Sequence, residues 1–315
     1  MIELTTTRAN PMIDPSMHVW GWEIPVYLFL GGLVAGMMII SGYFLFSGRY
    51  KSTLCACYQL PALAIGLLSV GMLALFLDLE HKLYFWRLYT TFEIASPMSW
   101  GSWILLLVYP SLLANLLLRV PASLQPVLDR LPAVVRLSES MRQRPKLITA
   151  VGALNMLLGG LLGVYTGILL SALGARPLWN SALLGPLFLV SGMSAAAAFG
   201  HMVARAPEER VLLAKADNGF LVAELVLIGL FLVGLVTSTR VHLEAARMFL
   251  GGPHTAVFWV FVVGLGVAVP LFIQLLAVNQ RIRHTPVAPL LVLVGGLALR
   301  FVIVSAGQAS HWSPF

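Results

Sequence analysis

Long apolar stretches alternate with short polar connections along this chain, and that pattern predicts its fold. Each apolar stretch is close to the length of about 20 helical residues that crosses the hydrocarbon core of a bilayer. The pattern therefore predicts an all-α, polytopic membrane protein with eight transmembrane helices. We expect them at Ile24–Phe46, Leu60–Leu77, Trp100–Leu118, Leu147–Leu173, Ser181–Ala204, Gly219–Thr239, Thr255–Val278 and Val287–Gln308.

The composition agrees with this interpretation. Of the 315 residues, 59% are hydrophobic and only 10% are charged, whereas about 25% charged residues is usual in a soluble domain. The formal net charge of +7 comes from Lys and Arg in the short connections. In a membrane protein such charges set the orientation, so we give little weight to a nucleic-acid partner.

The distribution of Lys and Arg predicts the orientation. The connections after the first, third, fifth and seventh helices hold 13 of these residues, and the opposite side holds 6. Cytoplasmic loops carry the excess of positive charge, so both termini are expected in the periplasm. The expected organisation is a periplasmic segment (1–23), three helices of a first bundle (24–118), a basic cytoplasmic loop (119–146), the fourth helix of that bundle (147–173), a second four-helix bundle (181–308) and a periplasmic tail (309–315).

Few charges fall within the apolar stretches, and each one is a candidate for function because a charge inside a bilayer is costly. Glu224 lies in the sixth predicted helix and Arg300 in the eighth. Glu23 and Asp78 lie at the outer ends of the first and second helices. For each residue alone, a structural pair or an interfacial cap remains as good an explanation as function.

The predicted topology brings several of these groups to one level of the outer leaflet. Trp22, Glu23 and Tyr27 begin the first helix, while Asp78 ends the second and Tyr165 lies in the outer half of the fourth. Apolar walls with a few polar groups suit a quinone, and a carboxylate can exchange its protons. The alternative is an ordinary belt of interfacial aromatic residues.

Haem is not expected in this protein. A membrane dihaem cytochrome needs paired His ligands on facing helices, and of the seven His only His201 falls within a predicted helix. No sequence motif indicates a metal or a nucleotide site.

Five short motifs, taken in order, resemble those of the NrfD/PsrC family, the membrane subunits of polysulfide reductase and related respiratory complexes. Each motif alone is weak, but the ordered set spans nearly the whole sequence. The motifs are residues 20–32 (WGWEIPVYLFLGG), 77–79 (LDL), 96–101 (SPMSWG), 165–167 (YTG) leading to 177–180 (PLWN), and 296–300 (GLALR) leading to 306–308 (AGQ).

The resemblance implies two four-helix bundles and a quinone site near the periplasmic side. Tyr165 matches the family tyrosine that hydrogen-bonds the quinone, Asp78 fits an acidic position proposed for proton handling, and Arg300 matches an arginine of the last helix. The expected quinone-binding residues are His18, Trp22, Glu23, Tyr27, Asp78, Tyr165, Trp179 and Asn180, and the expected proton-transfer residues are Asp78, Glu80, Glu224 and Arg300.

The sequence thus predicts the membrane anchor of a respiratory oxidoreductase complex in the bacterial inner membrane. The resemblance implies menaquinone or ubiquinone as the cofactor, with no haem or metal in this subunit. It also implies an iron–sulfur partner at the periplasmic face and a molybdopterin or multihaem catalytic subunit beyond it. A transporter or channel without a redox role, or an anchor with a degenerate quinone site, remains the alternative.

Overall fold

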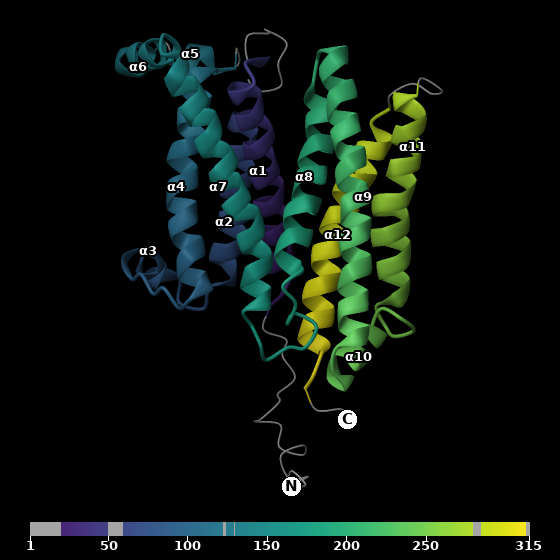
Figure 1. Ribbon diagram of the computed structural model, residues 1–315. Helices are drawn as coiled ribbons and strands as arrows, with labels where there is room; N and C mark the ends of the chain where they lie inside the picture. Colours follow the sequence, from purple (N-terminus) through teal and green to yellow (C-terminus); the bar gives the residue numbers. More distant parts are fainter. Residues whose placement is uncertain (1–19, 50–58, 122–123, 129, 280–284, 313–315) are drawn as a thin grey trace.

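The computed structural model describes residues 20–49, 59–121, 124–128, 130–279 and 285–312. In these ranges every regular element is a helix, and eight helices are long and apolar enough to cross a membrane (Figure 1). The predicted number of spans is confirmed. They are α1 (Glu23–Phe46), α2 (Leu60–Asp78), α4 (Pro97–Leu118), α7 (Pro145–Ser171), α8 (Leu184–Val203), α9 (Pro207–Thr237), the π-helix η5 (Val257–Ala268) continued by α11 (Val269–Val278), and α12 (Val287–Ala309).

Shorter helices lie in three of the connections, which were expected to be loops. They are η4 (Lys82–Tyr84) and α3 (Arg87–Thr90) between α2 and α4, α5 (Gln125–Leu128) and α6 (Pro132–Arg142) between α4 and α7, and α10 (Arg240–Arg247) between α9 and η5. The largest difference within a span is in α9, which begins at Pro207 rather than at the predicted Gly219.

Helix α1 is the centre of the structure. It packs against α2, α7, α8 and α12, and most of its residues are buried. Helix α4 packs against α2 and α7, whereas α9, α11 and α12 pack together on the other side of α8. The start of α1 and the end of α12 lie at one end of the molecule, here called the termini end (Figure 1). Helices α5 and α6 lie at the opposite end, here called the basic end.

The central helices approach closely through glycine. A Cβ on Gly192 of α8 would overlap the backbone of Gly32 in α1. Small residues permit such contacts between membrane helices, where packing has to replace the hydrophobic effect. In contrast, many large apolar side chains point outward, among them Leu73, Leu157 and Phe272. Such an apolar surface is suited to contact with lipid.

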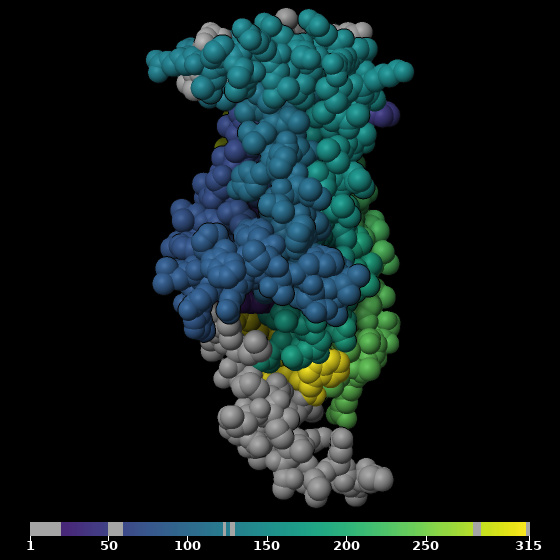
Figure 2. Space-filling view, turned by 90° about the vertical axis from the view of Figure 1, so that its left-hand side faces the viewer, coloured from purple at the N-terminus to yellow at the C-terminus, as the bar shows by residue number. Residues whose placement is uncertain are grey.

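Both ends project beyond the helices that face lipid. In Figure 2, the α2–α4 connection bulges outward above the termini end, and the region of α5 and α6 forms a broad cap at the basic end. The first projection contains the candidate site.

Candidate functional site

Two buried tyrosines meet where α1, α4 and α7 converge near the termini end. Tyr27 and Tyr165 are 2% and 5% exposed, and both Tyr165 and Tyr89 of α3 lie close enough to Tyr27 to interact with it electrostatically. The ring of Tyr165 fills the space beside Gly101 of α4, where any Cβ would overlap it. The expected meeting of Tyr27 with Tyr165 is therefore found.

Two carboxylates lie at the same end. Glu23 begins α1 and Asp78 ends α2, and both are half-buried. The two side chains are close enough to interact electrostatically. Carboxylates are groups that can accept and release protons.

A cavity of about 570 Å³ opens between the end of α2 and the start of α4. Its volume falls in the range of roughly 300–1,000 Å³ that is usual for small-molecule sites. Asp78 and Glu80 supply carboxylates, and Arg87 supplies a guanidinium that lies over the Tyr84 ring, 5.0 Å from its centre. The remaining lining residues are Leu79, His81, Phe85, Leu88, Thr91, Glu93, Ser96, Met98 and Ser99.

Tyr89 connects this cavity to the tyrosine pair. It follows Leu88, which lines the cavity, and it interacts electrostatically with Tyr27. Burial raises the pKa of Tyr89, and the nearby Tyr109 raises it further. The Tyr89 hydroxyl therefore stays protonated at neutral pH and is able to donate a hydrogen bond. Tyr89 was not a predicted site residue, because it lies in a connection that was expected to be a simple loop.

A second group of polar side chains lies inside the membrane-spanning region. Arg300 is 1% exposed. Its guanidinium donates to Ser191 Oγ, to the Phe188 carbonyl at 2.9 Å and to the Gly296 carbonyl at 3.2 Å. Ser191 also hydrogen-bonds Glu224, which interacts electrostatically with Arg300. The two charges predicted inside the membrane thus belong to one network.

Asp217 continues this network toward the basic end. It is fully buried, and its two carboxylate oxygens accept hydrogen bonds from Ser194 Oγ and Gln274 Nε2, both at 2.6 Å. It also interacts electrostatically with Glu224. Asp217 was not a predicted site residue, because the sixth helix was expected to begin after it. Its spacing of seven residues from Glu224, which places both on one face of a helix, was the available signal.

The polar groups therefore follow one another along the helix axes. Gly32 of α1 faces the Arg300 guanidinium and lies five residues after Tyr27, about 7.5 Å further from the termini end. On α9, Asp217 lies about 10 Å beyond Glu224 in the same direction. A cavity of about 130 Å³, lined by His201 and Arg210, lies at the basic end of α8 and α9.

Among the described residues that were predicted to bind quinone, Asp78 lines the cavity, whereas Glu23, Tyr27 and Tyr165 do not. The remaining predicted residues lie as follows. Trp179 is buried beside Gly307 and donates Nε1–H to the Ile303 carbonyl at 2.9 Å, so its polar atom is already engaged. Asn180 and Trp22 are exposed and are not among the residues that line the cavity. Glu80 is exposed at the cavity wall. His18 lies outside the described residues.

Comparison with known proteins identifies the family. The profile of the family described as polysulphide reductase, NrfD, matches residues 11–310. The chain belongs to the NrfD polysulphide reductase family. The C subunit of polysulfide reductase from Wolinella succinogenes is 32% identical over 92% of the present sequence and 94% of its own length. Protein NrfD of Escherichia coli is 31% identical over 92% and 95%, and the NrfD homolog of Haemophilus influenzae is 27% identical over 97% and 99%.

Family membership confirms the resemblance drawn from the five motifs. In this NrfD-family protein, residues 20–32 include the start of α1 and Tyr27, and residues 96–101 include the start of α4. Asp78 and Leu79 of residues 77–79 line the cavity. Tyr165 and Arg300 lie in the remaining two motifs. The motifs therefore contain polar groups of the termini end and the arginine of the network inside the membrane-spanning region.

Proposed function

We propose that this protein is the quinone-binding membrane subunit of a respiratory oxidoreductase complex. The observation that carries the proposal is the convergence of Tyr27 and Tyr165, the Glu23–Asp78 pair and an adjoining cavity at one end of the helices. Apolar and aromatic walls fit the ring of a quinone, and hydroxyl and carboxylate groups fit its two oxygens. Either menaquinone or ubiquinone meets this requirement.

The name of one relative supports the presence of partner subunits. The Wolinella relative is named as one of the polypeptides of polysulfide reductase, so that protein is one subunit of a larger enzyme. By analogy, we propose an iron–sulfur subunit bound over the termini end, with a molybdopterin or multihaem catalytic subunit beyond it. We also propose that the protein lies in the bacterial inner membrane, with both termini in the periplasm and its eight helices in two four-helix bundles.

The residues of the site then have distinct roles. A bound quinol supplies two electrons and two protons. The hydroxyls of Tyr165 and Tyr27 orient its ring through hydrogen bonds, and the burial of both tyrosines excludes water from them. The two electrons pass to the proposed iron–sulfur partner, and the two protons leave one after the other through Asp78 to Glu80, which is exposed at the cavity wall. In the reverse direction of electron flow, the same carboxylates deliver protons.

The network of Arg300, Glu224 and Asp217 supports a second proton route within the same function. Ser191 joins Arg300 to Glu224, and Asp217 follows toward the basic end. Buried ionisable groups in sequence through a membrane are typical of proton relays. We propose that this network exchanges protons between the quinone site and the cytoplasmic side.

Substitutions at the site test the proposal. In the purified complex, Asp78→Asn should lower quinol oxidation at least about ten-fold, because general acid–base groups contribute roughly 10²–10⁴-fold. Tyr165→Phe should weaken quinone binding about five-fold, the value of one hydrogen bond of about 1 kcal/mol. Quenching of tryptophan fluorescence by a soluble naphthoquinone measures that binding directly.

Matched controls exist on the same molecule. Tyr43→Phe removes a hydroxyl from an exposed residue of α1, and Glu139→Gln removes a carboxylate from the surface of α6. Neither change should alter turnover or binding. The proposed site is wrong if Tyr165→Phe and Asp78→Asn behave like these two controls.

A further inference from the structure

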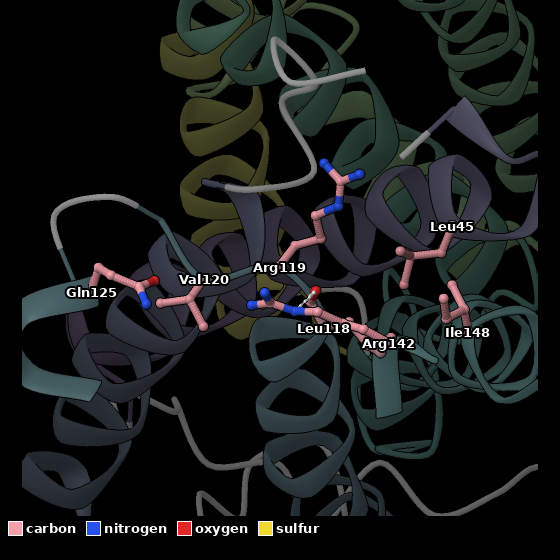
Figure 3. Close-up of a pocket in the computed structure, with 7 residues that line it drawn as sticks. All are labelled: Leu45, Leu118, Arg119, Val120, Gln125, Arg142 and Ile148. Carbon is pink, nitrogen blue, oxygen red and sulfur yellow. Dashed lines mark hydrogen bonds between the residues drawn. The ribbon is translucent and has the colours of Figure 1, made fainter. Parts of the chain in front are cut away.

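A further cavity, of about 310 Å³, lies at the basic end (Figure 3). The ends of α1 and α4 and the start of α7 meet there, and they supply the apolar walls Leu45, Leu118 and Ile148. The polar lining consists of Arg119, Gln125 and Arg142. Every ionised side chain that lines this cavity in the described part of the protein is therefore a cation.

Helix α6 holds Arg142 in place. Ser138 Oγ donates to the Leu117 carbonyl at 2.6 Å, and Arg142 Nε donates to the Leu118 carbonyl at 3.0 Å. These bonds satisfy carbonyls at the C-terminus of α4, which would otherwise lack partners. The bond of Arg142 uses one of the five N–H donors that a guanidinium carries. In Figure 3, its two terminal nitrogens are directed toward Val120 and Gln125.

The position of the cavity indicates a ligand that is both anionic and apolar. It lies where three membrane-spanning helices begin or end, the level at which hydrocarbon gives way to headgroups. Helix α6 packs against the ends of α4 and α7 at this level (Figure 1). Its surroundings are cationic, since residues 119–146 hold six Lys and Arg against two acids. The N-terminus of α7 adds partial positive charge beside Ile148.

We propose that this cavity binds the phosphate of an anionic phospholipid. Arg142 donates hydrogen bonds to the phosphate oxygens through its terminal nitrogens, and Gln125 lies in the cavity wall in the direction of those nitrogens. The apolar walls below contact the start of the acyl chains. Basic pockets between transmembrane helices are suited to such headgroups, and the lipid would join α6 to the ends of α1, α4 and α7.

Binding by the full-length protein in detergent tests the proposal. Native mass spectrometry would follow titrations with short-chain phosphatidylglycerol and with phosphatidylcholine. The wild-type protein should prefer phosphatidylglycerol, and Arg142→Gln should weaken that binding about five-fold, the effect of one basic residue near a lipid surface. Gln125→Glu should weaken it similarly, because it places a negative charge beside the phosphate while leaving the Arg142 bond to α4 intact.

The control is Arg136→Gln, which removes an exposed charge from α6 outside the cavity. It should leave binding unchanged. Equal losses of binding in Arg136→Gln and Arg142→Gln would show that the lipid binds to a diffuse basic surface and not to this cavity. Displacement of the lipid by equimolar inorganic phosphate would show that the cavity binds free anions. No preference for phosphatidylglycerol over phosphatidylcholine would also overturn the proposal. Should Arg142→Gln fail to fold, Gln125→Glu alone decides.

Discussion

Arg300 is a buried cation whose partners come from several helices. It contacts the Phe188 carbonyl and Ser191 on α8, and its guanidinium carbon lies 4.6 Å from the centre of the Phe188 ring. Glu224 on α9 supplies the opposite charge through Ser191. A buried charge is tolerated only when it is paired and hydrogen-bonded, so Arg300 and Glu224 depend on each other.

This dependence predicts a non-additive effect on stability. Arg300→Gln leaves Glu224 buried without its cation, so the free energy of unfolding should fall by about 3 kcal/mol. The double variant Arg300→Gln/Glu224→Gln removes both charges and should recover part of that loss. Thermal unfolding of the purified protein in detergent measures both. A double variant that is no more stable than Arg300→Gln alone would show that the two charges are not coupled.

Among single residues, the sequence identified a buried charge only where that charge interrupted an apolar stretch. Glu224 and Arg300 were found for that reason. Asp217 was not, because the polar residues around it made the start of α9 look like a connection, although its carboxylate is fully buried. Tyr89 was missed for a similar reason. Burial of a polar residue depends on neighbours that are distant in sequence, and a single sequence does not reveal them.

At the level of whole helices, the close approach of α4 to α7 fixes the position of Tyr165. Gly101 contacts the Tyr165 ring so closely that any Cβ would overlap the ring and its hydroxyl. The lack of a side chain at position 101 thus lets α4 close over the tyrosine. Packing of two whole helices thereby sets the position of one hydroxyl.

Gly101→Ala should therefore displace Tyr165. Overpacking of this kind costs about 1–3 kcal/mol, and we expect quinone binding to weaken at least as much as in Tyr165→Phe. Gly66→Ala on α2 is the control, because a Cβ there meets open space and alanine favours a helix. Fluorescence titration with the naphthoquinone and thermal unfolding would be measured on both variants. Unchanged binding in Gly101→Ala would mean that the Tyr165 position is not set by α4.

The sequence predicted the long helices but not the short ones. All eight membrane-spanning helices were predicted, most within three residues at each end, because long apolar stretches must form helices to satisfy their backbone in lipid. The short helices α3, α6 and α10 were not predicted. Helix α6 depends on bonds from Ser138 and Arg142 to the end of α4, and such tertiary contacts leave little trace in local hydropathy.

The whole molecule has an asymmetric distribution of charge along the membrane normal. In the sequence, the predicted connections on the side of the basic end hold 13 Lys and Arg, whereas the predicted connections and end segments on the opposite side hold 6. The candidate quinone site lies at the end with fewer cations, together with the start of α1 and the end of α12 (Figure 1). If the basic end is cytoplasmic, the quinone site and its proposed iron–sulfur partner both belong to the periplasmic side.

Labelling of single cysteines tests this orientation. In a protein with Cys55→Ser and Cys57→Ser, we would introduce Ala175→Cys in the α7–α8 connection or Gln143→Cys after α6, both at exposed positions. A membrane-impermeant maleimide added to intact spheroplasts should label position 175 and reach position 143 only after the membrane is permeabilised, because basic loops stay in the cytoplasm. Labelling of position 143 alone in intact spheroplasts would show that the protein has the opposite orientation. The carboxylates of the proposed quinone site would then exchange protons with the cytoplasm, and the proposed iron–sulfur partner would have to bind there.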